Sequence, residues 1–291
     1  MIQVSKKMTY ALAAIVFMAA ALLLSISSLV PYNTYVSTSN DEAAKAGIAV
    51  PIIMYHSVVK AGEATLGDYV TTTEALSKDI AYIIGNGYTP VFFSDLEKYA
   101  NDLDYSLPAK PIIICFDDGY YNTYTYVYSI FKDQGIKFVV AVVGSYVEKA
   151  QERQSTVYSY CTWEQIAEMH ESGIVELLNH SDNMHRIGTR RGILPRQGES
   201  VLAYEEALRQ DLMKNQSCLE ELGATSMTFV YPYGLYNKTT EAAIKKLGFT
   251  SSTTCEEGIN YILKGAELFK LKRFNRPHGP SAETFFSNII I

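Results

Sequence analysis

Two adjacent carboxylates, Asp117 and Asp118, follow an apolar run from Pro111 to Phe116 and come directly before Gly119. An uninterrupted apolar run bounded by Pro and Gly is typical of a buried strand in an α/β protein. Acids at the carboxyl end of such a strand lie where these folds place their chemistry. Because successive side chains of an extended chain point to opposite sides, we expect one acid to bind a metal and the other to act as a base.

Two histidines, His180 and His185, form the second candidate group, and they follow the strand-like segment 175–178. On an α-helix, their five-residue separation rotates them apart by roughly 140°, so a shared ion requires a strand end that runs into a loop. Two neutral imidazoles and one carboxylate form a common catalytic zinc site with open positions for water and substrate. Two unrelated surface histidines are the alternative, and non-haem iron oxygenases use the same ligand types.

Strand-like and helix-like segments alternate from Val50 onward. The expected strands are 50–55, 112–116, 138–143, 174–178, 227–231 and 268–274. The expected helices are 73–85, 120–133, 162–172, 202–222 and 239–247, and the one long loop is 186–200. This alternation predicts parallel strands with outer helices, arranged as an α/β barrel or an open sheet.

Three motifs in this order resemble the polysaccharide deacetylases of the NodB-homology type (carbohydrate esterase family 4). They are FDDG at 116–119, HSxxxH at 180–185 and YPYG at 231–234. The segment PIIMYH at 51–56 resembles the circularly permuted branch that acts on poly-N-acetylglucosamine, and the likeness runs from about Val50 to Phe274. It implies a distorted (β/α) barrel and a metal-dependent hydrolase that removes acetyl groups from the N-acetylated amino sugars of a cell-surface polysaccharide, releasing acetate.

The same resemblance implies roles for individual residues. Asp118, His180 and His185 would bind a divalent metal, with zinc expected first and cobalt, nickel or manganese as alternatives. Asp117 would be the general base, His56 the general acid, and Tyr233 would offer its backbone N–H to the oxyanion. An inactive carbohydrate-binding protein of the same fold is the alternative.

The sequence departs from the family at the residue that usually steadies the general base. Most members carry an Arg before the Pro-Tyr pair, where this chain has Val230 and Tyr231. Arg273, at the end of the last predicted strand, is our hypothesis for the residue that fills the vacant role, and it is also a candidate for substrate contact.

Two further sets of residues are candidates for substrate contact. Tyr120 follows the acid pair and is a candidate for stacking on a sugar ring, although packing in a Tyr-rich chain is the alternative. Arg190 and Arg191 belong to the arginine-rich loop 186–200, which also contains Arg186 and Arg196. Such a loop beside the site is either a solvated surface or a grip for an anionic polymer such as peptidoglycan.

Composition limits the classes of protein and partner. Hydrophobic residues make up 48% and charged residues 19% of the 291 residues, so the chain can bury a substantial core. The net charge of -6 argues against a nucleic-acid partner. Spacing alone leaves open a disulfide among Cys161, Cys218 and Cys255, whereas Cys115 lies inside a predicted strand.

The N-terminal 30 residues predict a membrane anchor. Lys6 and Lys7 precede an uncharged apolar stretch from Met8 to Val30, which is long enough to cross a bilayer of about 30 Å. We interpret residues 1–30 as a single-pass signal anchor, 31–49 as a polar tether and 50–291 as an extracytoplasmic catalytic domain. If the N-terminal segment is cleaved, the domain is secreted instead.

Overall fold

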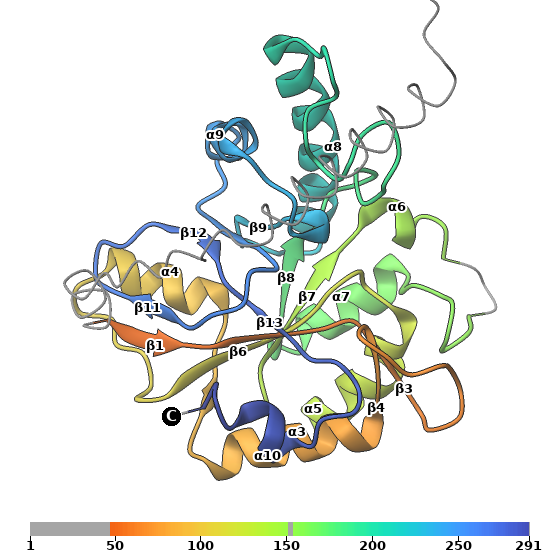
Figure 1. Cartoon of the computed structure of the whole chain (residues 1–291), viewed down its shortest axis with the longest axis vertical. Coiled ribbons are helices and arrows are strands. Elements are labelled where there is room, and N and C mark those ends of the chain that lie inside the picture. Colours follow the sequence, from red (N-terminus) through yellow and green to blue (C-terminus); the bar gives the residue numbers. More distant parts are fainter. Residues whose placement is uncertain (1–46, 151–153, 291) are drawn as a thin grey trace, which may run out of the picture. The chain divides into compact units, whose positions relative to one another are not determined.

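A parallel sheet forms the centre of the computed structural model, which describes residues 47–150 and 154–290 (Figure 1). Its nine strands are ordered β12-β10-β9-β8-β7-β6-β2-β13, with β5 also paired to β6. The strands are β2 (Ile52–Tyr55), β5 (Thr89–Pro90), β6 (Pro111–Phe116), β7 (Phe138–Val142), β8 (Val175–Asn179), β9 (Thr228–Val230), β10 (Ser251–Thr253), β12 (Leu268–Leu271) and β13 (Phe274–Asn275). All neighbours pair in parallel, and β6, β7 and β8 are wholly buried, as the apolar runs predict.

The sheet curls until its two edges come close together. β12 and β13 are the edge strands, yet only Lys272 and Arg273 separate them in sequence. The three Cα steps from Leu271 to Phe274 span at most about 11 Å. The two strands do not pair with each other, so the barrel stays open between them. We call the connecting residues Lys272 and Arg273, which cross this gap, the seam. The parallel α/β fold is thus confirmed, as a curled sheet that forms an incomplete barrel.

The two faces of the sheet carry different apolar clusters. On β6, Ile112, Ile114 and Phe116 pack with residues of the surrounding helices. Ile113 and Cys115 point to the opposite face, where they join a cluster that includes residues of α4 (Phe93–Asn101). By the same alternation, Asp117 continues the face of Cys115.

The helices agree with the sequence patterns in most places. α3 (Thr73–Gly85) has the predicted bounds, and α7 (Trp163–Glu171) begins with a capping box between Thr162 and Gln165. The predicted helix 120–133 is instead a π-helix, η2 (Thr123–Tyr128), followed by α5 (Ser129–Lys132). The remaining helices are α6 (Gly144–Val147), α8 (Val201–Glu221), η3 (Pro232–Gly234), α9 (Lys238–Lys246) and α10 (Ala282–Phe286).

The folded domain begins slightly earlier than predicted. β1 (Ile48–Val50) pairs with β11 (Asn260–Ile262), so the end of the proposed tether 31–49 belongs to the domain. A smaller pair joins β3 (Ser57–Val59) to β4 (Val70–Thr72). The predicted anchor, 1–30, lies outside the described residues, and among those described no helix has the length and apolar character needed to span a bilayer.

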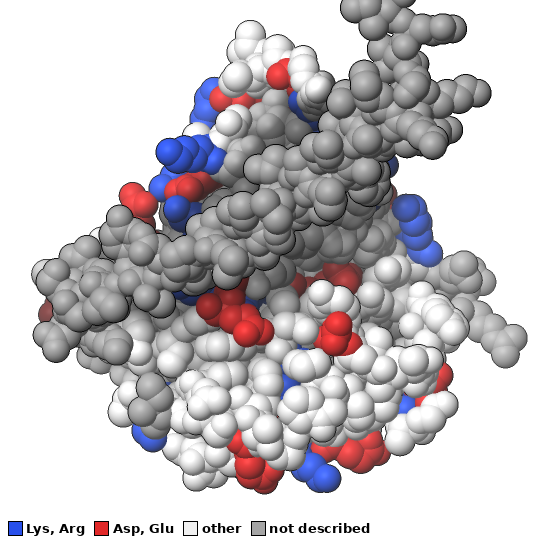
Figure 2. Space-filling model, in the orientation of Figure 1, with Lys and Arg blue, Asp and Glu red and all other residues white. Residues whose placement is uncertain are grey.

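On the face shown in Figure 2, the acidic and basic side chains are interspersed.

Candidate active site

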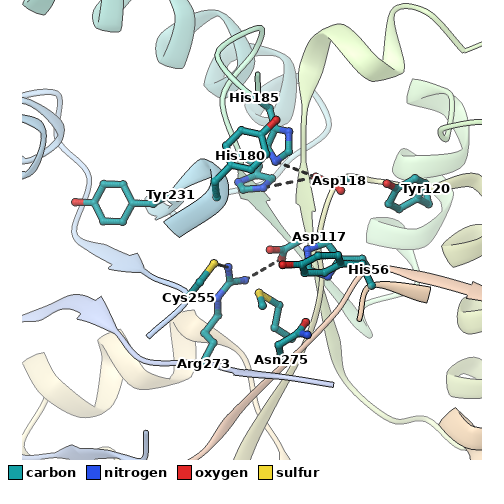
Figure 3. Close-up of a pocket in the computed structure, with 13 residues that line it drawn as sticks. His56, Asp117, Asp118, Tyr120, His180, His185, Tyr231, Cys255, Arg273 and Asn275 are labelled. Carbon is teal, nitrogen blue, oxygen red and sulfur yellow. Dashed lines mark hydrogen bonds and ion pairs between the residues drawn. The ribbon is translucent and has the colours of Figure 1, made fainter. Parts of the chain in front are cut away.

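A cavity of about 420 Å³ opens at the carboxyl ends of the central strands (Figure 3). Eight of the ten predicted site residues line it, and Arg190 and Arg191 do not. The complete lining is Met54, His56, Tyr69, Asp117, Asp118, Tyr120, His180, His185, Tyr231, Tyr233, Cys255, Arg273 and Asn275. The chain therefore concentrates its acids and histidines at the edge of the sheet where parallel α/β folds place their sites.

Asp118, His180 and His185 converge on one point. The Oδ1 atom of Asp118 lies 3.6 Å from Nε2 of His180 and 3.3 Å from Nε2 of His185. One ligand atom from each of the three residues lies within 4.8 Å of the others. Asp118 has a left-handed φ of 73°, which turns its carboxylate away from the path of Asp117. This turn gives the two neighbouring acids separate positions.

The Nδ1 atom of each histidine already lies within hydrogen-bond distance of a protein oxygen. Nδ1 of His180 lies 2.8 Å from the carbonyl oxygen of Val230 on β9. Nδ1 of His185 lies 3.2 Å from the hydroxyl of Tyr146. A proton held on Nδ1 of His180 by the carbonyl leaves the Nε2 lone pair free, which is the arrangement of metal-ligating histidines.

The electrostatics of this cluster fit a divalent cation. Burial raises the pKa of Asp118 to about 6 and lowers the pKa of His180 to about 3. Oδ1 of Asp118 is a buried oxygen without a hydrogen-bond donor among the described residues. A cation bound between the three side chains would satisfy this oxygen and favour the ionised carboxylate and the neutral imidazoles. The residues present therefore fit the predicted metal.

Asp117 occupies a different environment from its neighbour. Nη1 of Arg273 donates to Oδ1 of Asp117 over 2.9 Å, and the Cys115 thiol lies 3.2 Å from the same oxygen. Burial alone would raise the pKa of Asp117, but the guanidinium of Arg273, together with the nearby His180 and His56, outweighs burial and holds the pKa well below its usual range. Asp117 is therefore an ionised carboxylate whose Oδ2 remains to accept a proton.

Arg273 reaches Asp117 from the seam of the barrel. Its side chain is fully buried, and its Nε donates to the carbonyl oxygen of Thr254 over 2.9 Å. The structure thus places against Asp117 the arginine that the sequence hypothesis selected. Full burial also means that Arg273 acts on the carboxylate rather than on a polymer at the surface.

His56 forms another wall of the cavity. Its ring lies edge-on to the ring of Tyr69, with the centroids 4.8 Å apart. Its Nδ1 is buried and has no partner among the described residues. Burial lowers the pKa of His56, although Asp117 and Asp118 partly oppose this shift. The imidazole is thus neutral at rest and, once protonated, a ready proton donor.

Two tyrosines that were predicted from the sequence also line the cavity. Tyr120 forms a hydrogen bond with Asp118 and stacks on Tyr160 at 5.1 Å, so its hydroxyl and one face of its ring are occupied. Tyr233 has a left-handed φ of 59° within η3 and places its ring 4.5 Å from that of His185. Next to it, Gly234 has a φ of 66°, and a Cβ there would lie 2.7 Å from Cβ of Cys255. This turn therefore requires glycine for both conformation and space.

The arginine-rich loop differs from the expectation of four exposed cations. Arg190 is 5% exposed, and its guanidinium pairs with Glu199, donates to the Leu194 carbonyl and lies over the ring of Tyr204. The charge of Arg190 is thus satisfied within the loop itself. Arg191 is exposed but lies outside the cavity lining.

Several cavity residues were missed by the sequence reasoning. Tyr69, Asn275 and Cys255 come from segments that carry no motif, and only the fold brings them to the site. All four cysteines have free thiols, so the disulfide left open by their spacing does not form. Position at a strand end would have singled out Asn275, the last residue of β13.

The structure places a candidate metal site of Asp118, His180 and His185 on a curled α/β sheet, and comparison with known proteins identifies the family. The sequence profile described as polysaccharide deacetylase matches residues 104–252. This chain belongs to the polysaccharide deacetylase family.

Individual relatives agree with the family assignment. The chain is 29% identical over 240 residues to the poly-beta-1,6-N-acetyl-D-glucosamine N-deacetylase of Escherichia coli K12, covering 75% of this chain and 35% of that protein. It thus spans about a third of that relative's length. A de-N-acetylase structure from Aggregatibacter actinomycetemcomitans matches with a TM-score of 0.68 and 25% identity, covering 83% of this chain and 98% of that one. The structure of IcaB from Ammonifex degensii matches in fold, with a TM-score of 0.66, 24% identity, and coverage of 79% of this chain and 93% of that one.

Proposed function

We propose that this chain is a divalent-metal-dependent N-deacetylase that hydrolyses the acetamido groups of a cell-surface polysaccharide. The observation that carries the proposal is the presence, in one cavity, of a three-residue metal-type cluster beside a separate carboxylate paired with Arg273. The similarity to poly-beta-1,6-N-acetyl-D-glucosamine N-deacetylases favours poly-N-acetylglucosamine as the polymer. Peptidoglycan and chitin-like polymers are the other substrates to compare.

The proposed chemistry divides the hydrolysis among residues of the cavity. When bound by Asp118, His180 and His185, the metal ion supplies a Lewis acid for water and the acetyl carbonyl. Asp117 accepts a proton from the water as its oxygen attacks the amide carbon. The backbone N–H of Tyr233 donates to the developing oxyanion. His56, once protonated from solvent, gives that proton to the departing nitrogen as the C–N bond breaks. The products are acetate and a free amino sugar, and the proton held by Asp117 returns to solvent.

An acetate-release assay tests this proposal. Purified protein is incubated with poly-N-acetylglucosamine, chitooligosaccharides and peptidoglycan, before and after a chelator and after re-addition of zinc, cobalt, nickel or manganese. We expect acetate from at least one polymer, loss of activity with the chelator and recovery with metal. Binding of the polymer without acetate release would instead indicate an inactive carbohydrate-binding protein, and a requirement for oxygen would indicate an oxygenase.

The cellular location is part of the same proposal. Residues 1–30 would anchor the chain in the cell membrane with the catalytic domain outside, because the apolar stretch 8–30 is long enough to span a bilayer. Membrane fractionation of cells that produce the full chain, compared with a chain lacking residues 1–43, tests this location. Release of a shortened chain into the medium would show that the N-terminal segment is cleaved.

A further inference from the structure

An exposed aromatic ring lies beside the proposed general acid. Tyr69 is 60% exposed, lines the cavity and contacts His56 edge-on at 4.8 Å. The other aromatic side chains of the cavity are less available. Tyr231 is fully buried, Tyr120 is stacked on Tyr160, and Tyr233 leans on His185 with 44% of its surface exposed. Tyr69 therefore offers the most open ring surface on the His56 side.

The backbone around Tyr69 is fixed to two parts of the site. The Tyr69 carbonyl accepts a hydrogen bond of 3.0 Å from the N–H of Ser57, the residue after His56. The preceding Asp68 carbonyl accepts a bond of 2.9 Å from the side chain of Asn275, which itself lines the cavity. The ring is thus exposed although its main chain is held in place. Packing in the core does not account for this ring, because most of it is exposed. An exposed aromatic ring with an ordered backbone can instead stack on a sugar ring.

We propose that Tyr69 is a sugar platform that stacks on the amino sugar whose nitrogen is released and directs that nitrogen toward His56. This inference rests on the proposed deacetylase function and adds a specificity-determining residue to it. Tyr69 contacts the ring of the sugar and takes no proton in the reaction. Its contribution is therefore made to binding and orientation of a substrate that has a sugar ring, and it is absent for an acetyl compound without one.

Kinetics on two substrates test the platform. The variants are Tyr69→Ala, Tyr69→Leu, which retains apolar bulk, and Tyr69→Trp, which retains a flat ring. The substrates are a β-1,6-linked N-acetylglucosamine pentamer and vinyl acetate, which has no ring. We expect the Ala and Leu variants to raise KM for the pentamer about tenfold with little change in kcat, and Trp to restore it. Hydrolysis of vinyl acetate should be the same in all of them.

Tyr158→Ala is the matched control, because Tyr158 is 84% exposed and does not line the cavity. An unchanged KM for the pentamer in the Ala and Leu variants would overturn the proposal. A fall in kcat with a shifted pH profile would also overturn it, since Tyr69 would then act only through His56. Equal losses of activity on the pentamer and on vinyl acetate would indicate that Tyr69 has only a structural role, and would also overturn the proposal.

A binding measurement separates this inference from the proposed function. Calorimetry of the pentamer with Asp117→Asn protein, with and without Tyr69→Ala, requires no turnover. About tenfold weaker binding in the double variant supports the platform even if the wild type releases no acetate, in which case only the proposed function fails. Equal affinities, or no binding by Asp117→Asn protein, would reject the platform.

Discussion

Two buried arginine–aspartate pairs flank β13, and they differ in how completely the carboxylate is bonded. Before β13, Arg273 makes one bond to Asp117, on Oδ1. After β13, Arg276 binds both oxygens of Asp79, with Nε at 2.8 Å and Nη2 at 2.9 Å. All four residues are at most 3% exposed.

The second pair has no capacity left for a substrate. The hydroxyl of Tyr55 also donates to Asp79, and Arg276 donates further to the carbonyls of Pro277 and Pro280. This network fastens the segment after β13 to α3. The first pair keeps one carboxylate oxygen at the cavity. The comparison teaches that equal burial and equal residue types give a structural pair when every oxygen is bonded and a reactive one when an oxygen is left over.

Removing the charge of Asp117 should give the largest effect. Asp117→Asn should lower turnover about 10²–10⁴-fold while the protein keeps its metal, because base catalysis is lost and the ligands are not. Acetate release and metal content by elemental analysis measure the two properties. If Asp117→Asn also emptied the metal site, the division of roles between the two acids would be wrong. Asp118→Asn is the comparison, and it should lose metal and activity together.

Removing the charge of Asp79 should act on stability instead. Asp79→Asn leaves Arg276 buried without its counter-charge, which typically costs about 3–5 kcal/mol of unfolding free energy. Urea unfolding measures this loss, and kcat of the folded protein should stay near the wild-type value. A large fall in kcat at unchanged stability would mean that the second pair also serves the reaction.

Replacing each arginine should change the pH dependence of kcat/KM for the first pair and not for the second. In Arg273→Gln, the pKa of Asp117 rises because the opposing charge is gone, so the acid limb of the kcat/KM profile should move up by about 1–3 pH units. Arg276→Gln is the matched control and should leave the limb in place. Identical profiles for both variants would show that Arg273 does not set the ionisation of the base.

In the metal-free protein, His180 should contribute a loss of stability as the pH falls from about 7 to 5. Asp118 opposes this loss in part, because its raised pKa of about 6 lets the folded carboxyl take up a proton in the same window. The pKa of His180 is about 3 in the folded state, below its value in the unfolded chain, so the unfolded chain binds more protons in this window. Stability therefore falls with pH, by about 2 kcal/mol for this group. Urea unfolding of chelated wild-type and His180→Asn protein at both pH values isolates this contribution, because the variant should lose about 2 kcal/mol less than the wild type between pH 7 and 5.

The arginine loop should show the smallest effects. Arg191→Gln should change the unfolding free energy by no more than about 0.5 kcal/mol, since Arg191 is exposed. Arg190→Gln should cost about 1–3 kcal/mol, because Glu199 loses its buried partner. Equal results for the two would contradict the distinction between a surface arginine and an internal one.

The sequence was sufficient for the strand-end residues and insufficient for the partners that come from distant segments. Asp117, Asp118 and His180 each follow a long apolar strand, so periodicity and motif spacing located them. The burial of Arg190 against Glu199 could not be predicted, because charge density along the chain does not show which arginine a nearby Glu will pair with. Tyr69 was missed because its exposure and its contact with His56 arise only when β3 and β4 pair.

Short elements account for most of the differences in the fold. β10 contains only Ser251, Ser252 and Thr253, which carry no apolar signal, although the strand is completely buried. The predicted strand 268–274 is divided between two edges of the sheet, since Lys272 and Arg273 cross the seam. A linear hydrophobic pattern cannot show that a sheet has curled back on itself.

The open seam links the motion of the barrel to the ionisation of its base. Edge strands lack one row of backbone partners, so thermal opening of a curled sheet is concentrated where its edges meet. In this chain, the residue at that place is Arg273. Its guanidinium holds the Asp117 carboxylate on one side and the Thr254 carbonyl on the other. The residue that crosses the gap between the two sheet edges is therefore also the one that keeps Asp117 ionised, so the closure of the sheet and the charge of the proposed base depend on the same side chain.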